Sequence, residues 1–307
     1  MKCFHHTDMD GWCAAAIVAI KENSKNMSDF IEIDYEKKSW KDRENIIQEL
    51  NKDEDIYIVD LSFDNNTVKY LKEICNKVGF DHVHWCDHHK TSIETMKKFP
   101  EIINHIKGIL SDENSGAYLT WQYLMKSEQI PFVIKLVSDF DTFHLKLYPS
   151  SMQFKYCIES ENKYYITDNC HPNNIYAWKM LIDSDQKVYE CIEKGKIMMK
   201  YAFSDFERYR DKYCYESKIG DIPCVVINRQ GTGSMIFGDL QSKYDYLITY
   251  VFNGDKYIYS IYSENKDPKI DCSLIAKQYG GGGHKGAAGF TSDKLLFKKV
   301  KEVEFNE

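Results

Sequence analysis

The chain has 307 residues, 43% of them apolar, which is enough for two domains that each bury a core. The longest uninterrupted apolar stretch, Cys13 to Ile20, is too short to cross a bilayer, and no signal-peptide hydrophobic region follows Met1. We therefore expect a cytoplasmic protein without a membrane partner. The formal net charge of −7 argues against a long nucleic-acid groove, although not against short nucleotides. Ten cysteines without a CxxC pair predict buried thiols rather than disulfides or a cysteine-type zinc site.

The first half of the chain alternates strand-like and helix-like stretches, a pattern that is typical of βαβ units and predicts a parallel sheet. Strands are expected at Lys2–His6, Ile31–Tyr35, Ile56–Val59 and Val83–Cys86. Helices are expected at Trp12–Lys21 and Thr67–Lys77, around Ala117–Met125, and after Pro131, with an amphipathic stretch at Lys41–Asn51 and a loop around Pro100. Residues 150–180 are aromatic and irregular, and they predict no particular element.

The second half begins with a long helix, whose apolar stripe from Val188 to Phe206 is typical of a connector between domains. Strands follow at Cys224–Asn228, Tyr246–Phe252 and Tyr257–Tyr262, and the last two are joined by a turn at residues 253–255. We expect a larger domain over residues 1–185, a helical linker over 186–214 and a smaller α/β domain over 215–307.

Four short segments place carboxylates and imidazoles at the ends of apolar, β-favouring runs. They are His6-Thr7-Asp8-Met9-Asp10-Gly11, Val59-Asp60, Asp87-His88-His89 and Asp139-Phe140-Asp141. Because the carboxyl ends of parallel strands meet at one edge of a sheet, these segments are expected to converge. Alternation along an extended backbone would point His6, Asp8 and Asp10 in the same direction, and Gly11 would allow a tight turn into the next helix.

Mixed carboxylate and imidazole ligands predict a centre for two divalent cations, with Asp60 placed to bridge them. This ligand set suits Mn²⁺, whereas Mg²⁺, the alternative, prefers oxygen. Two such ions would return about four positive charges to the acidic cluster. Each segment alone has an ordinary interpretation, because aspartate often caps helices and paired histidines can be solvated loop residues. The four segments together favour the metal interpretation.

Near the C-terminus, the glycines at 280–283 precede His284 and Lys285. Successive glycines free backbone N–H groups to turn towards an anion, and the two side chains add donors. A flexible turn is the alternative, but the apolar segments on both sides favour an ordered phosphate or nucleotide site. The substrate-binding candidates are Gly281, Gly282, Gly283, His284 and Lys285, together with Tyr262 as a ring that could stack on a base.

These motifs resemble those of the DHH phosphoesterase superfamily. The family name is the tripeptide at Asp87, His88 and His89, its first motif is similar to residues 6–11, and its substrate domain carries a GGGH element similar to residues 280–290. The resemblance implies an N-terminal parallel-sheet DHH catalytic domain with helices on both faces. A helical linker would join it to a smaller α/β substrate-binding domain.

The resemblance also implies roles for single residues. His6, Asp8 and Asp60 would hold one Mn²⁺, while Asp10, Asp60, His88 and a fourth-motif aspartate would hold the other. That aspartate is either Asp141, which we favour, or Asp139, which would otherwise be a nearby acid. Asp87 and His89 would belong to the catalytic residues, with His89 close to the scissile phosphate.

The first motif resembles the nanoRNase type within this family, whose members degrade short oligoribonucleotides from one end and can dephosphorylate 3′-phosphoadenosine 5′-phosphate. The expected partners are therefore short RNA oligonucleotides or mononucleotide phosphates, and a homodimer stays open. An inorganic pyrophosphatase or polyphosphatase is the alternative enzyme. A non-catalytic nucleotide sensor is the alternative from another functional class.

Overall fold

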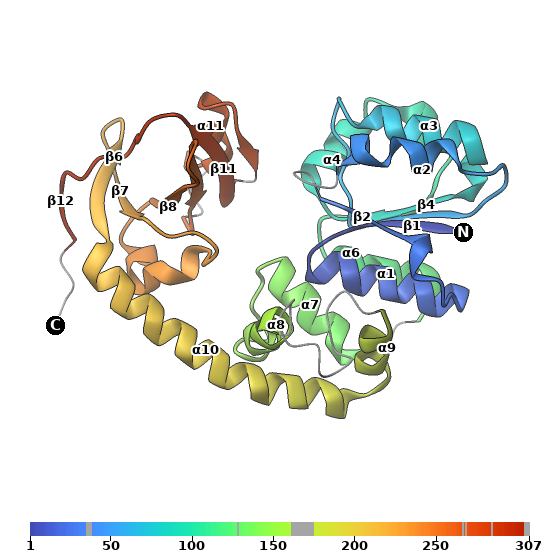
Figure 1. Ribbon diagram of the computed structural model, residues 1–307, viewed down its shortest axis with the longest axis horizontal. Coiled ribbons are helices and arrows are strands. Elements are labelled where there is room, and N and C mark those ends of the chain that lie inside the picture. Colours follow the sequence, from blue (N-terminus) through green and yellow to red (C-terminus); the bar gives the residue numbers. More distant parts are fainter. Residues whose placement is uncertain are drawn as a thin grey trace. The chain divides into compact units, whose positions relative to one another are not determined.

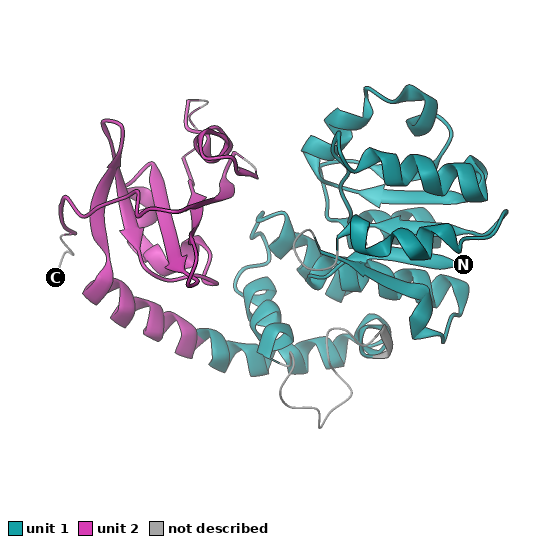
Figure 2. Ribbon diagram, turned by 45° about the horizontal axis from the view of Figure 1, so that its top comes forward, with its two compact units in different colours: residues 1–199 teal, residues 200–307 magenta. Residues whose placement is uncertain are grey.

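The computed structural model describes residues 1–34, 39–127, 129–160, 175–265, 267, 269–283 and 285–303 (Figure 1). It divides the chain into two compact units, residues 1–199 and residues 200–307 (Figure 2). Tyr35, which was expected in a strand, and His284, a substrate-binding candidate, lie outside the described residues. Within the described ranges, no helix combines the length and the apolar character that a membrane span requires.

The first unit is built on a parallel sheet with strand order β2-β1-β3-β4-β5 (Figure 1). Its strands are β1 (Lys2–His6), β2 (Phe30–Ile33), β3 (Ile56–Val59), β4 (Val83–Asp87) and β5 (Lys107–Leu110). Every residue of the central strand β3 is buried, because helices cover both faces of a parallel sheet. Since all pairings are parallel, the carboxyl ends of these strands share one edge.

Helices cover both faces of this sheet and form two separate cores. One face carries α1 (Met9–Glu22), α6 (Gly116–Met125), α7 (Phe132–Asp141), α8 (Ser150–Ser160), α9 (Ile175–Asp183) and the start of α10 (Asp185–Tyr213). The other face carries α2 (Glu44–Gln48), α3 (Val68–Val78), α4 (Lys90–Met96) and α5 (Pro100–Ile103). Helix α1 is buried from Asp10 to Ala19, and its small alanines allow other helices to pack closely on it. The predicted α/β class with helices on both faces is therefore confirmed.

The main differences from the predicted elements lie between residues 90 and 183. Strand β5 and helices α4 and α5 replace the expected loop around Pro100, while α8 and α9 fill much of the region without a clear pattern. Strand β5 lies at the sheet edge, and its first two residues are exposed, so it lacks the apolar run by which a buried strand is recognised.

The second unit is a mixed seven-stranded sheet with strand order β10-β11-β9-β8-β7-β6-β12. Its strands are β6 (Tyr215–Ile219), β7 (Ile222–Ile227), β8 (Tyr246–Phe252), β9 (Tyr257–Tyr262), β10 (Gly282–Gly283), β11 (Ala287–Ser292) and β12 (Lys301–Glu302). The predicted hairpin is the antiparallel pair β8–β9. Helix α11 (Cys272–Gln278) packs on one face of this sheet. The 3-10 segment η4 (Ser234–Ser242) and the C-terminal part of α10 pack on the other face.

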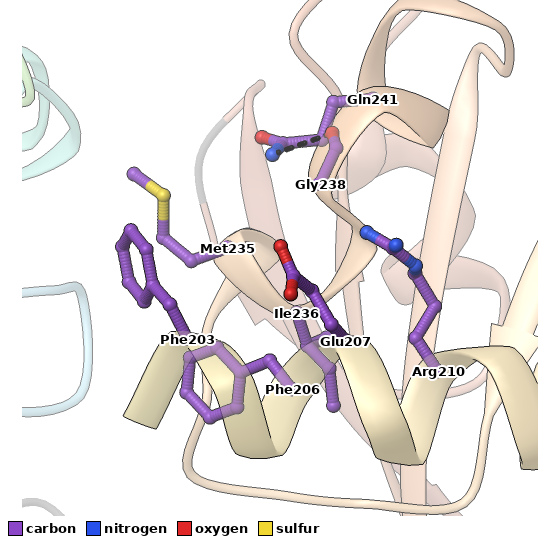
Figure 3. Close-up of a pocket in the computed structure, with 8 residues that line it drawn as sticks. All are labelled: Phe203, Phe206, Glu207, Arg210, Met235, Ile236, Gly238 and Gln241. Atoms are coloured by element: carbon purple, nitrogen blue, oxygen red, sulfur yellow. Dashed lines mark hydrogen bonds between the residues drawn. The ribbon is translucent and has the colours of Figure 1, made fainter. Parts of the chain in front are cut away.

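A small pocket lies between α10 and η4 in the second unit (Figure 3). Its volume is about 230 Å³, and Phe203, Phe206 and Arg210 of α10 contribute to its wall. Segment η4 is kinked at Gly238, where φ is +53°, and a Cβ there would lie 2.1 Å from Arg210 Nη1. The backbone conformation therefore favours glycine at this position, and a Cβ there would displace the end of the Arg210 side chain.

Candidate metal centre

Three of the four acidic and histidine-containing segments meet at the carboxyl edge of the first sheet, as the sequence predicts. His6 is the last residue of β1, Asp60 directly follows β3, and Asp87 ends β4 immediately before His88 and His89. His88 Nε2 lies 3.3 Å from Asp60 Oδ1, and His6 Nδ1 lies 3.9 Å from Asp60 Oδ2. Parallel pairing of neighbouring strands is sufficient to bring these residues together.

The fourth segment reaches the centre from a helix rather than from a strand end. Asp141 is the last residue of α7, which begins after Pro131, and its Oδ2 lies 3.3 Å from His88 Nε2. The expectation that all four segments follow strand-like runs was therefore wrong for this one, whereas the helix expected after Pro131 is present. The apolar residues before Asp139 follow a helical spacing and pack in the core beside α1.

The first motif also differs from its predicted geometry. Asp8 is the N-cap of α1, and its Oδ1 accepts a 2.9 Å hydrogen bond from the Gly11 N–H. Because this cap starts the helix at Met9, Asp10 lies in the first helical turn and not on an extended backbone. The alternation argument was therefore wrong beyond Asp8.

Close approach explains Gly11 better than the predicted tight turn. Gly11 has a helical backbone, and a Cβ on it would lie 2.4 Å from the carbonyl oxygen of His6. Asp60, in contrast, does adopt the left-handed conformation, with φ of +53°, and it ends β3 there. A side chain other than glycine in this conformation costs stability and is often retained at functional sites.

Candidate metal ligands form three overlapping groups in this centre. The groups are His6, Asp8 and Asp60; Asp10, His88 and Asp141; and Asp60, His88 and His89. In each group, one ligand atom from every residue lies within 4.8 Å of the others. Asp60 and His88 each belong to two groups. Imidazole nitrogens and carboxylate oxygens that lie this close together match the ligands that divalent transition-metal ions prefer.

Asp60 supplies the clearest electrostatic evidence for a cation. Its side chain is buried, and neither of its carboxylate oxygens accepts a hydrogen bond from any residue that the structure describes. Burial, followed by the nearby charges of Asp10, Asp8, Asp141 and Asp87, raises its pKa well above the usual value. A buried carboxylate without donors and among like charges is costly, and a bound cation would compensate it. The residues present therefore fit a divalent metal.

The N-terminus of α6 positions Asp10, a contact that the sequence does not reveal. Gly116 N and Ala117 N donate to the two Asp10 oxygens at 2.6 and 3.1 Å. A Cβ on Gly116 would lie 2.6 Å from Asp60 Cβ and 3.0 Å from Asp10 Oδ2. Ser115 before the apolar helix is a recognisable N-cap, but a cap pattern does not reveal which distant carboxylate the helix end will bind.

His89 is oriented by the aspartate of its own motif. Its Nδ1 donates a 2.7 Å hydrogen bond to Asp87 Oδ1, and Asp87 is fully buried at the end of β4. Burial lowers the pKa of His89, but the hydrogen bond and charge of Asp87, with the charges of Asp8 and Asp10, raise it overall. Asp87 thus fixes the orientation of this imidazole.

The two aspartates of the fourth segment have different surroundings. The Asp139 oxygens accept hydrogen bonds from the backbone N–H groups of Lys146 and Leu147, at 2.7 and 3.0 Å. Asp139 belongs to none of the three ligand groups that the described residues form, whereas Asp141 does. Asp139 therefore holds the loop that follows α7.

The glycine-rich segment is an ordered part of the second sheet. Gly282 and Gly283 form β10, paired antiparallel with β11. The N–H groups of Gly280 and Gly281 donate to carbonyls at the end of α11, at 3.1 and 2.9 Å. The expected anion cradle is therefore wrong for these two N–H groups, which end a helix instead. A Cβ on Gly281 would lie 2.1 Å from a β11 carbonyl oxygen, so close strand packing requires glycine there.

The other substrate-binding candidates are also in the second unit. Lys285 follows the glycines, and its carbonyl oxygen accepts a 2.9 Å hydrogen bond from Cys272 N at the start of α11. Tyr262 ends β9 and is partly buried on the sheet face that packs against α10 and η4. That packing leaves only part of the Tyr262 ring available to a base.

Comparisons with known proteins find one relative by sequence and solved structures of similar fold. No protein-family model matches the sequence. The uncharacterized protein R106 of Acanthamoeba polyphaga mimivirus is 29% identical over 229 residues, 70% of this chain and 50% of that protein, so the chain spans about half the length of this relative. The solved DHH domain of a protein described as a member of a family of ribosomal proteins has a TM-score of 0.57 at 13% identity, over 94% of this chain and 81% of that chain.

A second solved structure of similar fold is the pGpG-specific phosphodiesterase PggH from Vibrio cholerae. It has a TM-score of 0.52 at 13% identity and covers 94% of this chain and 92% of its own. At this level of identity, the likeness concerns the fold.

Proposed function

We propose that this protein, which has the fold of the DHH phosphoesterases, is a divalent-metal-dependent phosphoesterase that hydrolyses short oligoribonucleotides from one end. The observation that carries the proposal is Asp60, a buried carboxylate that accepts no hydrogen bond from the described residues. It lies between His6 and His88, and these two histidines belong to different groups of candidate metal ligands. A cation on each side would give this side chain the compensation that it otherwise lacks.

The candidate ligands divide around Asp60 into two sets. His6, Asp8 and Asp60 would hold one ion, and Asp10, Asp60, His88 and Asp141 would hold the other. Mn²⁺ accepts both imidazole and carboxylate ligands, so it is the metal to test first, with Mg²⁺ as the alternative. When bound, such ions would supply Lewis-acid activation and neutralise phosphate charge.

The protein's own side chains would orient the reaction. Asp87 fixes the ring of His89 through a 2.7 Å hydrogen bond, and this imidazole would donate a proton to a phosphate or leaving-group oxygen. The N–H groups at the start of α6 hold both Asp10 oxygens, which keeps this carboxylate in one orientation. Preorganised groups of this kind need not rearrange when charge develops on the reacting phosphate.

The substrate class is supported by charge and by resemblance. A net charge of −7 does not favour a long polyanion, and the first motif resembles the nanoRNase type. The Vibrio cholerae protein of similar fold is named for pGpG, so short oligonucleotides are the first substrates to test. Lys285, Gly282, Gly283 and Tyr262 of the second unit, with His284, are the candidates for binding them.

The test is a product analysis with purified protein in Mn²⁺, in Mg²⁺ and in a chelator. The substrates are end-labelled RNA of two, three and five nucleotides, 3′-phosphoadenosine 5′-phosphate and pyrophosphate. We expect metal-dependent release of mononucleotides from the shortest RNA. If only pyrophosphate is cleaved, the protein is a pyrophosphatase or polyphosphatase and not a ribonuclease. Tight nucleotide binding without turnover would indicate a sensor.

Two matched variants connect this activity to the centre. Asp60→Asn should abolish turnover. Asp81→Asn makes the same substitution at an exposed position just before the N-terminal end of β4, away from the centre at its carboxyl end, and should leave turnover unchanged. Near-normal hydrolysis by the Asp60 variant would remove this residue from the mechanism.

A further inference from the structure

The loop after α7 contains two residues with unfavourable backbone conformations. Phe143 and Leu145 have φ of +54° and +52°, in the left-handed region that favours glycine. Helix α7 ends at Asp141, and Phe143 lies just beyond its C-cap Thr142, where its N–H donates to Phe140 O at 3.0 Å. Glycine is the usual residue at this position of a helix end, because its backbone adopts the conformation without a steric cost.

Burial does not explain the phenylalanine at this position. Phe143 is 42% exposed and belongs to none of the hydrophobic clusters that the described residues form. A single exposed aromatic residue is ordinary on a protein surface. An exposed aromatic residue in a conformation that costs stability is a different case, because packing does not repay the cost.

The strained loop is also held firmly from α7. The Asp139 side chain accepts the backbone N–H groups of Lys146 and Leu147, and its carbonyl oxygen accepts that of Leu145 at 3.3 Å. Thr142 Oγ1 donates to Ser138 O at 2.7 Å. Backbone strain that the surroundings enforce in this way is typical of sites where a side chain must be presented to a ligand.

The position of the loop indicates which ligand this is. Asp141, two residues before Phe143, lies 3.3 Å from His88 in the metal centre. Two trans peptide units span at most about 7.6 Å between Cα atoms, so the Cα of Phe143 lies within that distance of the Cα of Asp141. A nucleotide bound at the centre is long enough to span this distance. A nucleobase is the part of an oligonucleotide that an exposed aromatic ring binds by stacking.

We propose that Phe143 binds substrate by stacking its ring on the base of the nucleotide whose phosphate is hydrolysed. This inference rests on the proposed function and adds a specificity-determining residue to it. The enforced backbone conformation fixes the direction in which the Phe143 side chain leaves the backbone before substrate arrives, so that little conformational freedom is lost on binding. Asp139 is the positioning residue that keeps the loop in this shape.

The test replaces Phe143 with glycine and with tryptophan. Phe143→Gly relieves the backbone strain, so its melting temperature should equal or exceed that of the wild type. Its KM for an RNA dinucleotide should rise about tenfold or more, because the stacking contact is lost. Phe143→Trp should keep the wild-type KM. For an abasic dinucleotide, with no base to stack, Phe143→Gly should leave KM unchanged.

Leu145→Gly is the matched control, since Leu145 has the same backbone conformation without an aromatic ring. It should also keep or raise the melting temperature, while KM for the dinucleotide stays unchanged. The inference is overturned if Phe143→Gly leaves the dinucleotide KM unchanged, raises KM equally for the abasic substrate, or lowers the melting temperature.

A binding measurement distinguishes an error in the proposed function from an error in the role of Phe143. If the wild type hydrolyses none of these substrates, equilibrium binding of the dinucleotide to wild type and to Phe143→Gly decides the question. Weaker binding by the glycine variant supports stacking, and equal binding rejects it.

Discussion

Replacing Asp60 with asparagine should stabilise the metal-free protein while it abolishes metal binding. The substitution keeps the shape of the side chain and replaces a buried ionisable group with a neutral amide. Asp60 accepts no hydrogen bond from the described residues, and four other aspartates raise its pKa. An unsatisfied buried polar group costs about 1–3 kcal/mol, and the new amide can donate to neighbouring carboxylates. We therefore expect a gain of about 1–3 kcal/mol in the free energy of unfolding without metal.

Asp139→Asn is the matched comparison. Asp139 is also a buried aspartate, but unlike Asp60 it accepts hydrogen bonds from backbone N–H groups. Both of its oxygens accept backbone N–H groups, and an amide nitrogen cannot accept either bond. Charge-assisted bonds of this kind contribute about 1.5–3 kcal/mol each, so this variant should lose stability of about that size. The change from aspartate to asparagine is thus expected to raise the free energy of unfolding at position 60 and to lower it at position 139.

Urea denaturation in a chelator measures both effects, with stability compared through the midpoint at constant slope. All five tryptophans, at positions 12, 40, 85, 121 and 178, lie in the first unit, so their fluorescence reports on the unit that contains the centre. Adding Mn²⁺ at one hundred times its Kd should stabilise the wild type by about 2.7 kcal/mol and the Asp60 variant far less. A metal-free Asp60 variant that is less stable than the wild type would refute the electrostatic reasoning.

Three further outcomes follow from the close contacts. Gly116→Ala should weaken Mn²⁺ binding in a titration and cost about 1–3 kcal/mol in stability, because its Cβ would lie 2.6 Å from Asp60 Cβ; unchanged affinity would contradict this. His89→Gln should lower kcat by about 10²–10⁴-fold with little change in Mn²⁺ affinity, as expected for a proton donor, and an unaltered kcat would exclude that role. Gly281→Ala should lower the melting temperature, whereas Gly282→Ala, with nothing within 4 Å of its Cβ, should not; equal effects would show that strand packing does not set the glycine requirement.

The sequence alone predicted the parts of the centre that depend on local pattern. Apolar strand runs that end in His6, Asp60 and Asp87 were recognisable, because strand periodicity and parallel pairing bring such ends to one sheet edge. The glycine-rich motif near the C-terminus was also visible as a pattern, but its local conformation was not.

The tertiary structure decided what depends on distant contacts. Asp10 binds Gly116, 106 positions away, and no local pattern specifies such a partner. Only the folded chain shows that Asp141 lies beside His88, whereas Asp139 binds the following loop. Periodicity reports only which face of an element is apolar, whereas the partners of a polar side chain are set by how elements from different parts of the chain pack together.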